Sequence, residues 1–582
     1  MRRRELQVGT SRHDGRDVTL SPPERSTHVH VVGASGSGKS RFLEHLIRQD
    51  AASGHGLCLI DPHGHLFDRV RDWIALKGLG RYRQVRLFQP TREGWSFGFN
   101  PLPSSTEGQA CVEYAVDAVV NTLASVWGGE DTTKTPRLRR CLKLTLYALA
   151  SHDLTLAEAG IFTATHDPDG LRRSLTEAIA DPFIAASWDD LNARPARTFA
   201  EEFESTNNRF FELLASSLIR RTVGSRDYAL DTRRAMDEGD IVLVDLSDRG
   251  GQLSRAAAQT LGALLIGDFM LKARGREDGA RAFHLYVDEA HRYLTPDVLD
   301  VLFEARKFGL HLTLAHQSLA QLGEPSGLLY RGVMAGAQTK VMFRLGSFSD
   351  ARPLAQETMV AEIDPQKAKR ALPSYQTIGH RRIWLRSEAE TTTDGGSSTT
   401  TDSWAETDQV GTSVGSSSGS GTRFDDEGEA RGTQESEITS ETSGYSSSTT
   451  RGGSNAYGSS WSTAATTGTS EALQAIIEKT YNQVYSLDEQ LLEQAKELQT
   501  QRQAEAILRR PTGELTRIKV PHVEDRNTAL SIVRRQIERF DTRALDAASF
   551  SVPTEIVAAE MEARAQSLIG GPPDVQEEPE DW

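Results

Sequence analysis

The sequence has 582 residues, only 38% of them apolar, so it is long enough for about three to four domains, and part of it is too polar to pack into a core. Its three cysteines form no CxxC pair, which argues against structural zinc and for a reducing compartment. The formal net charge is −15. The absence of a signal-peptide pattern in MRRRELQVGT and the interruption of the most apolar run by Asp268 argue against a secreted or membrane-spanning class, and predict a cytoplasmic protein.

Residues 1–26 are polar, and Val18 and Leu20 suggest a short hairpin that leads into the core. The segment Thr27–Ser40, THVHVVGASGSGKS, then brings an alternating apolar run directly before a match to the phosphate-binding loop G-x-x-x-x-G-K-[ST]. A helical segment, Arg41–Gln49, follows the loop. A strand before the loop and a helix after it distinguish a true phosphate-binding loop from a chance match, so we predict a nucleotide site here.

Each residue type in this loop has a task in binding phosphate. The glycines let successive backbone N–H groups point at phosphate oxygens, and the helix that follows adds the positive end of its dipole. We predict that Lys39 reaches the β- and γ-phosphates of ATP and that the hydroxyl of Ser40 binds Mg²⁺. A glycine-rich turn that binds nothing is the alternative, but such a turn has no need of Lys-Ser at its closing positions. The predicted nucleotide-binding residues are Gly33, Ala34, Ser35, Gly36, Ser37, Gly38, Lys39 and Ser40.

Short apolar runs between helical stretches predict an α/β fold with a parallel sheet that is buried on both faces. These runs are Leu57–Ile60, Val85–Phe88, Ile241–Val244, Phe283–Val287, His311–Ala315 and Lys340–Leu345. Between Pro103 and Glu238 the apolar period becomes that of helices, as in Val112, Val116 and Val119. We therefore expect an all-helical domain of about 130 residues inserted between two strands of the sheet.

The apolar strand Phe283–Val287 ends in the second chemical element, Asp288-Glu289. Adjacent carboxylates at a strand end suit a metal ligand beside a general base, because both must lie at the γ-phosphate. We assign Asp288 to Mg²⁺ and Glu289 to the general base. An acidic turn after a buried strand is the alternative, and the complete phosphate loop makes it the weaker one. The letters DEAH suggest a two-lobed helicase, but the sequence holds no second such lobe.

Gln317 ends the next predicted strand, where a polar side chain can contact the γ-phosphate and transmit its loss to a neighbouring helix. A surface glutamine is the alternative. Arg306 precedes that strand, and a solvated helix face is the simpler interpretation of it from the residues alone. Asp61-Pro62-His63-Gly64 follows another strand at the edge where ligands bind in open α/β sheets. A turn shaped by proline and glycine explains His63 almost as well as a ligand-binding role does.

Two segments carry most of the negative charge. Residues 388–470 hold thirteen acids and three arginines with hardly an aliphatic side chain, and residues 574–582 hold five acids and no base. We expect 388–470 to be disordered, because it cannot bury enough apolar surface to offset chain entropy. The rest of the chain is nearly neutral, and its basic clusters fit either DNA phosphates or charged helix surfaces; they are Arg137, Arg139, Arg140, Lys143, Arg220 and Arg221.

Order is predicted to resume with a helix from Glu471 to Gln499 and a hairpin at Ala504–Val520 that turns at Pro511-Thr512-Gly513. Two further helices are expected at Asn527–Phe540 and Glu555–Leu568. The predicted boundaries are a lead-in at 1–26, a first core part at 27–102, the helical insertion at 103–238, a second core part at 239–387, the disordered acidic loop at 388–470, a closing helix and hairpin at 471–522, and C-terminal helices with an acidic tail at 523–582.

The order of these elements resembles the HerA/FtsK superfamily of ring-forming, DNA-pumping ATPases. The segments that carry the resemblance are HVHVVGASGSGKS, LCLIDPHG, FNPL, GDIVLVDLS, FHLYVDEAH and EARKFGLHLTLAHQSLAQL, together with the helical insertion and SLDEQLLEQAKELQT. Within the superfamily, the chain is most similar to the TraG/TraD-type coupling proteins of conjugation and type IV secretion.

The resemblance implies a RecA-like P-loop core in a hexamer, with ATP and Mg²⁺ held between subunits and DNA in the central pore. By position it makes Asp288 and Glu289 the Walker B pair, Gln317 the sensor and Arg306 the arginine that acts on the neighbouring subunit. Unlike typical coupling proteins, the chain has no N-terminal transmembrane helices, so a role in DNA processing or phage defence with a partner nuclease fits as well. The alternative function is an ATP-gated scaffold ring that recruits or activates such an effector without pumping DNA.

Overall fold

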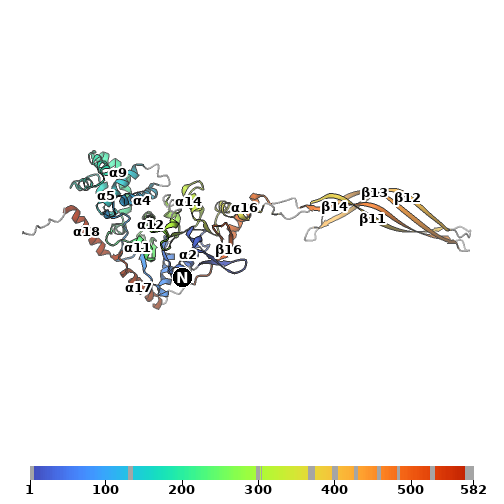
Figure 1. The fold of residues 1–582 in the computed structure, drawn as a ribbon, viewed down its shortest axis with the longest axis horizontal. Coiled ribbons are helices and arrows are strands. Elements are labelled where there is room, and N and C mark those ends of the chain that lie inside the picture. Colours follow the sequence, from blue (N-terminus) through green and yellow to red (C-terminus); the bar gives the residue numbers. More distant parts are fainter. Residues whose placement is uncertain are drawn as a thin grey trace, which may run out of the picture. The chain divides into compact units, whose positions relative to one another are not determined.

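A computed structural model describes residues 5–128, 136–295, 302, 305–364, 367, 374–395, 404–424, 430–454, 460–480, 485–524 and 531–570. Within 374–480 it describes the backbone alone. The chain divides into two compact units, the first from Met1–Ile363 and Asp488–Trp582, and the second from Asp364–Leu487. The first unit contains the predicted nucleotide loop (Figure 1).

An eleven-stranded sheet forms the centre of the first unit, in the order β2-β1-β16-β15-β10-β3-β9-β8-β4-β7-β5. The seven strands from β10 to β5 are parallel, and the other four extend the sheet in antiparallel pairs. Their bounds are β1 Leu6–Ser11, β2 Asp17–Leu20, β3 Val29–Val32, β4 Gly56–Asp61, β5 Val85–Phe88, β7 Ile241–Asp245, β8 Phe283–Val287, β9 Leu310–His316, β10 Thr339–Phe343, β15 Glu505–Arg509 and β16 Leu515–Lys519.

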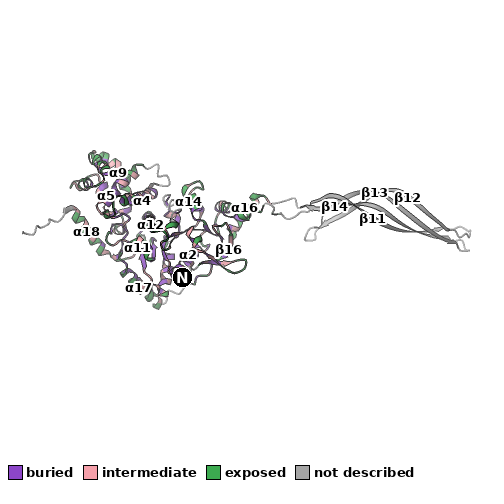
Figure 2. Cartoon of the chain, viewed as in Figure 1, coloured by how far each residue is buried: buried purple, intermediate pink, exposed green. Residues whose placement is uncertain are grey.

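The parallel strands are buried almost throughout, as their unbroken apolar runs predict (Figure 2). Strand β9 lies between β3, which carries the phosphate loop, and β8, which ends at Asp288. This strand order is the RecA-like one, so the predicted α/β fold class is confirmed. It also brings the carboxyl ends of the three strands together at one edge of the sheet.

Helices follow most of these strands, and glycine and hydroxyl residues at their ends explain where several begin and stop. Helix α2 begins after Gly38 and ends at Gly54, both in the left-handed region that favours glycine. The Ser254 hydroxyl accepts a hydrogen bond from the Ala257 N–H and caps α12. The helices of this core are α1 Pro22–Ser26, α2 Lys39–Ser53, α3 His65–Lys77, α12 Arg255–Arg274, α14 Leu328–Gly336, α15 Phe348–Thr358 and α16 Leu487–Thr500.

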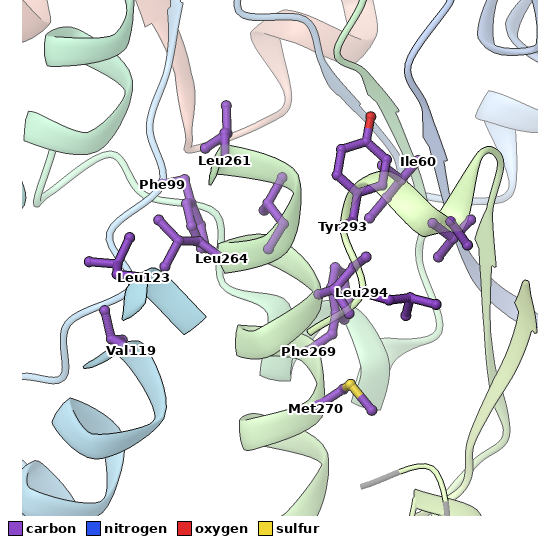
Figure 3. Close-up of a cluster of buried hydrophobic side chains, with 14 of the residues drawn as sticks. Ile60, Phe99, Val119, Leu123, Leu261, Leu264, Phe269, Met270, Tyr293 and Leu294 are labelled. Carbon is purple, nitrogen blue, oxygen red and sulfur yellow. The ribbon is translucent and has the colours of Figure 1, made fainter. Parts of the chain in front are cut away.

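The insertion follows strand β6 (Trp95–Phe97) and is helical throughout its described residues. It shares one hydrophobic core with the sheet: Val119 and Leu123 of α4 lie in the same buried cluster as Leu264 and Phe269 of α12 (Figure 3). This shared core explains why the insertion and the sheet form a single compact unit. Its helices are α4 Gln109–Gly128, α5 Pro136–Ser151, α6 Ala159–Thr163, α7 Leu171–Glu177, α8 Pro182–Asn192, α9 Ala196–Leu214, α10 Ser217–Gly224 and α11 Thr232–Glu238.

The C-terminal segment packs back onto the first unit. Helix α17 (Ser531–Asp546) contacts α3 and β5, strand β17 (Ser551–Pro553) pairs with β6, and helix α18 (Thr554–Gly570) contacts α10. The Arg564 guanidinium anchors α18 by an ion pair of 3.0 Å to Glu158, and its ion pair of 3.0 Å to Glu560 lies within the helix. The predicted acidic tail beyond residue 570 lies outside the described residues.

The second unit contains the segment 388–470, which we predict to be a disordered loop. Its described parts are strands of a four-stranded antiparallel sheet in the order β11-β14-β13-β12. Frequent threonine favours strands, and backbone pairing between long antiparallel segments needs no aliphatic side chains. The strands are β11 Ser374–Gly395, β12 Trp404–Phe424, β13 Ala430–Ser454 and β14 Ser460–Thr480.

The helix predicted from Glu471 to Gln499 is wrong at its start, where the structure has a strand. Residues up to Thr480 belong to β14, and the helix α16 begins at Leu487. A short apolar run such as ALQAII fits a strand as well as a helix, and its pairing with β11 decides the outcome. Before β9, the described residues 305–308 form the 3₁₀ turn η6, Ala305–Phe308.

Candidate functional site

The loop from Gly33 to Ser40 connects the carboxyl end of β3 to helix α2, as predicted. Gly36 and Gly38 have φ values of 73° and 117°, in the region that favours glycine. Gly33 is required for another reason, since a Cβ atom there would lie 2.4 Å from the Cβ of Phe343 in β10. The loop therefore has its tight course because the glycines permit it and because β10 packs against its start.

A segment far away in the sequence closes over this loop. The N–H of Ala504 donates a hydrogen bond of 2.9 Å to the carbonyl of Ser37, and Ala504 itself has a φ of 64°. A Cβ at Gly38 would lie 3.2 Å from the Ala504 backbone. Ala504 was not predicted for this site, because an alanine at the start of the predicted hairpin carries no signal of its own.

Lys39 is buried at the centre of the site. Its ammonium donates to the carbonyl of Gly33 at 2.5 Å, over the loop itself. Burial lowers the pKa of Lys39, and the negative charges of Glu289 and Asp288 oppose that shift. The lysine is therefore within electrostatic reach of both predicted carboxylates, while Ser40 lies half-buried in the first turn of α2.

Asp288 and Glu289 are both buried where β8 ends. Burial, together with the negative charges of Asp61 and Glu289, raises the pKa of Asp288 to about 7 against the opposing charge of Lys39. Glu289 has a φ of 47°, an uncommon conformation for a non-glycine residue that tends to occur at functional sites. The edge of the sheet thus holds more negative charge than Lys39 balances.

Gln317 lies directly beside Glu289. Its side-chain amide donates a hydrogen bond of 2.7 Å to the Glu289 carboxylate. The backbone N–H groups of Gln317 and Ser318 both donate to Oε1 of Gln321, which holds the end of β9 in place. The structure therefore brings together four residues that the sequence analysis assigned to one site, namely Lys39, Asp288, Glu289 and Gln317.

Arg306 is not part of this cluster. It lies in η6, before the amino end of β9, whereas Gln317 follows the carboxyl end of the same strand. With about 3.3 Å per residue, the seven residues of β9 separate the two positions by roughly 20 Å. Arg306 is exposed and is far from the nucleotide loop of its own chain.

Three histidines surround the site without having been predicted for it. The rings of His30 and His316 stack with centroids 4.7 Å apart, and their Nε2 atoms are in hydrogen-bond contact. Burial lowers the pKa of His316 to about 4, so it is neutral at physiological pH. His291 lies 3.5 Å from the Glu289 carboxylate, and burial lowers its pKa as well.

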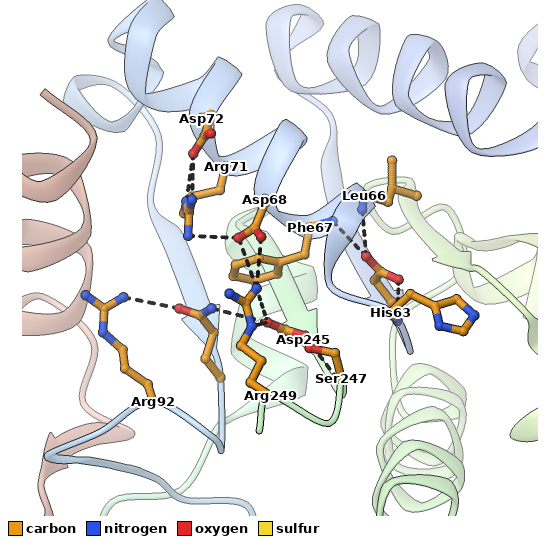
Figure 4. A network of polar contacts seen from close by, with 12 residues as sticks. His63, Leu66, Phe67, Asp68, Arg71, Asp72, Arg92, Asp245, Ser247 and Arg249 are labelled. Atoms are coloured by element: carbon orange, nitrogen blue, oxygen red, sulfur yellow. Dashed lines mark hydrogen bonds and ion pairs between the residues drawn. The ribbon is translucent and has the colours of Figure 1, made fainter. Parts of the chain in front are cut away.

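Asp61 explains the Asp-Pro-His-Gly turn. Its carboxylate accepts backbone hydrogen bonds from His63 at 2.8 Å, Leu66 at 2.8 Å and Phe67 at 2.9 Å, and so caps the start of α3. At the end of the adjacent β7, Asp245 accepts hydrogen bonds from Ser247 and Arg249 in a neighbouring network (Figure 4). The turn is therefore well explained by helix capping, and the backbone of His63 takes part in it.

Several of the predicted basic clusters are paired with other groups. Lys143 lies 2.8 Å from Asp117, and Arg140 lies 3.6 Å from Glu202. The Arg220 guanidinium donates to the carbonyls of Leu214 and Ala215. These contacts favour the charged-surface interpretation over a DNA interface at those positions.

The described residues hold no group of three or more His, Cys, Asp or Glu side chains arranged to hold a metal ion. No described helix combines the length and the apolar character that a membrane crossing requires.

Neither the protein-family models nor the curated proteins give a match to this sequence. Among solved structures, the chain is similar to the unbound monoclinic form of the bacterial conjugative coupling protein TrwBdeltaN70, at 15% identity over 90% of this chain and 91% of that chain, with a TM-score of 0.49. It is also similar to TrwB in complex with the ATP analogue ADPNP, at 17% identity over 61% of this chain and 78% of that chain, with a TM-score of 0.44.

A third similar structure is VirB4 of Thermoanaerobacter pseudethanolicus, at 15% identity over 61% of this chain and 88% of that chain, with a TM-score of 0.41. The similar structures therefore include a conjugative coupling protein, the type of protein that the sequence motifs resemble.

Proposed function

We propose that this protein is a Mg²⁺-dependent ATPase that assembles as a hexameric ring and moves DNA through a central pore. The observation that carries the proposal is the contact between Gln317 and Glu289, 2.7 Å long, at the sheet edge that also holds the loop of Lys39. A base, a polar side chain suited to sensing the γ-phosphate and a phosphate-binding lysine converge there, and ATP hydrolysis needs these groups together.

The carboxylates fit a bound magnesium ion. Burial and the nearby charges of Asp61 and Glu289 raise the pKa of Asp288 to about 7, and a bound cation would stabilise its ionised form. Mg²⁺ commonly takes one or two protein carboxylates and completes its shell with water and phosphate oxygens. Asp288 and the hydroxyl of Ser40 are the residues that would hold it, and the bound ion would neutralise charge on the β- and γ-phosphates.

The remaining residues have separate roles in hydrolysis. Lys39 binds the phosphates, which it can do by leaving the carbonyl of Gly33. Glu289 takes a proton from the attacking water, and the amide of Gln317 holds the Glu289 carboxylate in position. Loss of the γ-phosphate changes what Gln317 contacts, and β9 carries that change to the neighbouring elements.

Lys39→Ala tests the ATPase directly. The variant is expected to lose ATP hydrolysis by about 100-fold or more, because a cation at the transferred phosphate is removed. Phosphate release is measured with and without DNA, and Lys77→Ala, an exposed lysine of α3, is the matched control. Hydrolysis that persists unchanged in Lys39→Ala contradicts the proposed site.

DNA movement is tested separately by displacement of the third strand from a triplex. ATP-dependent displacement by the parent protein and its loss in Lys39→Ala support translocation. If ATP is hydrolysed and partner proteins bind in a nucleotide-dependent way without displacement, the protein acts as the ATP-gated scaffold instead.

A further inference from the structure

A groove of about 490 Å³ lies between helix α17 and the segment that joins α3 to β5. Its wall includes the short 3₁₀ turn η1, Leu79–Arg81, and the start of β5. No aspartate or glutamate lines the groove. Its charged lining residues are all arginines: Arg81, Arg83, Arg535, Arg539 and Arg543. We call the groove that these five residues line the arginine groove.

The arginines on α17 differ from most others in this chain. In the described residues, Arg535, Arg539 and Arg543 have no carboxylate within ion-pair distance. By contrast, the Arg517 guanidinium contacts two glutamates at 2.7 Å, and Arg92 contacts Asp541 at 3.1 Å. Asp541 belongs to α17 itself but is buried on another face of the helix, so it does not neutralise the groove.

The spacing of these arginines is unfavourable for an isolated helix. Arg535, Arg539 and Arg543 follow one another at four-residue intervals and therefore lie on one face. Like charges at this spacing destabilise a helix, and Glu538 and Asp546, which follow Arg535 and Arg543 by three residues, lie outside ion-pair distance of them. An anionic ligand in the groove would remove this repulsion.

Aromatic side chains accompany the charges. Phe540 lines the groove, and its ring packs so closely on Gly80 that a Cβ there would lie 2.7 Å from a ring carbon. Tyr82, next to Arg81, is 84% exposed. Guanidinium groups that hold phosphates, together with aromatic rings on which bases stack, are the features of grooves for single-stranded nucleic acid. The volume is that of a site for a nucleotide-sized ligand, which favours a single strand over a duplex.

The groove is remote from the predicted ATP site. It opens at the amino end of β5, the last strand of the sheet, while the phosphate loop follows the carboxyl end of β3. Strands β9, β8, β4 and β7 lie between the two, so neighbour spacings of about 4.8 Å separate β5 from β3 by roughly 24 Å. DNA binding in the groove can therefore be measured without ATP hydrolysis.

We propose that the arginine groove binds the phosphodiester backbone of single-stranded DNA, with Arg535, Arg539 and Arg543 on successive phosphates and a base against Tyr82 or Phe540. The proposal rests on the proposed function in supplying DNA as the ligand. It goes beyond the proposed contact of DNA with the central pore, because it places a DNA-binding site at the outer edge of the sheet.

The test is equilibrium binding of a fluorescein-labelled oligothymidylate to the full chain, without nucleotide, over a range of salt concentrations. A variant with Arg535→Ala, Arg539→Ala and Arg543→Ala is expected to bind roughly tenfold more weakly. The slope of its plot of log affinity against log salt should become less steep by about 2, since each phosphate contact on a single strand contributes about 0.7. Arg534→Ala, which removes an exposed arginine of α17 outside the groove, is the matched control and should bind like the parent.

Tyr82→Ala gives a second measurement that leaves the helix unchanged. It is expected to weaken binding while the salt slope stays the same, because a stacking contact releases no counterions. Basal ATP hydrolysis should be unchanged in all of these variants, and this readout also verifies that they are folded.

Two results would overturn the proposal. One is equal oligonucleotide affinity and equal salt slope in the triple variant and the parent, including the case in which neither binds. The other is tight binding of a synthetic peptide of residues 571–582 that the triple variant loses while it keeps its oligonucleotide affinity, which would make the groove an acidic-peptide site. Neither result bears on the ATPase, which the Lys39→Ala comparison tests by itself.

Discussion

The two edges of the parallel sheet present opposite charge. At the carboxyl edge, strands β4, β8 and β7 end in Asp61, Asp288-Glu289 and Asp245, and Lys39 is a buried cation among these acids. At the amino edge, Arg306 precedes β9, and the arginine groove opens beside β5. These cations have no acidic partner within the described residues, apart from the distant charges that act on Arg83.

This difference indicates what one subunit lacks. Phosphoryl transfer spreads negative charge over the transferred group, and an arginine commonly stabilises it. The carboxyl edge supplies a base and metal ligands, while Arg306 lies roughly 20 Å away along β9 and is exposed. We therefore infer that the carboxyl edge of one subunit meets the amino edge of the next.

The largest effect is expected from Arg306→Ala. An arginine that acts across a subunit interface raises the rate of hydrolysis by about 10³-fold or more, so the rate of this variant should fall by that factor. Mixing it with Glu289→Gln subunits should restore part of the activity, because an intact carboxyl edge then meets an intact arginine. Lys307→Ala, an exposed neighbour in the same turn, is the control. The absence of rescue at every mixing ratio would rule out the action between subunits.

Glu289→Gln alone tests the carboxyl edge. Loss of a general base is expected to slow hydrolysis by between about 10²- and 10⁴-fold while nucleotide binding is kept, since the glutamine oxygen can still accept the bond from Gln317. Hydrolysis and binding of a fluorescent ATP analogue are measured in parallel, with Glu324→Gln as an exposed control. Normal hydrolysis in Glu289→Gln would show that another group is the base.

The smallest effect is expected at Asp268, an acid of helix α12 that lies at neither edge of the sheet. Burial raises the pKa of Asp268 from 3.8 to about 6, against the opposing effects of Lys272 and of a hydrogen bond from Thr232. The native state thus binds a proton more tightly than the unfolded chain, and the free energy of unfolding should fall as pH rises from about 4 to 6. Asp268→Asn removes this loss and should stabilise the protein at neutral pH by up to about 3 kcal/mol.

Urea denaturation at several pH values measures this effect. Near pH 4 the Asp268→Asn variant and the parent should be about equally stable, because the aspartate is then largely protonated in the native state. Asp189→Asn, on the exposed face of α8, should change nothing at any pH. A destabilised Asp268→Asn variant at neutral pH would show that the ionised carboxylate has a partner that amide chemistry cannot replace.

Some of the site could be predicted from local pattern alone. The glycines, Lys39 and Ser40 follow a recognised spacing, and Asp288 and Gln317 each follow an unbroken apolar run. Residues after parallel strands gather at one sheet edge, so predicting the strands also predicted that these side chains meet. Ala504 could not be found in this way, because its contact with Ser37 depends on a chain reversal more than 450 residues later.

The segment after the acidic loop shows where local pattern fails. The ALQAII run fitted a helix that begins at Glu471, but the residues up to Thr480 belong to strand β14. That strand depends on backbone pairing with β11, up to about 100 residues earlier in the chain, which a local run does not report. The position of Arg306 is a similar case: its spacing from Gln317 was visible, but only the extended course of β9 puts the two at opposite edges.

The α/β class, the phosphate loop and the residues at the strand ends could be predicted from the sequence, because these depend on near neighbours in the chain. The folded chain was needed to show the strand order that joins Glu289 to Gln317, the closure of the loop by Ala504 and the gathering of arginines beside β5. These features depend on which distant segments pack together, and packing is set by the burial and hydrogen bonding of the whole chain rather than by any local period.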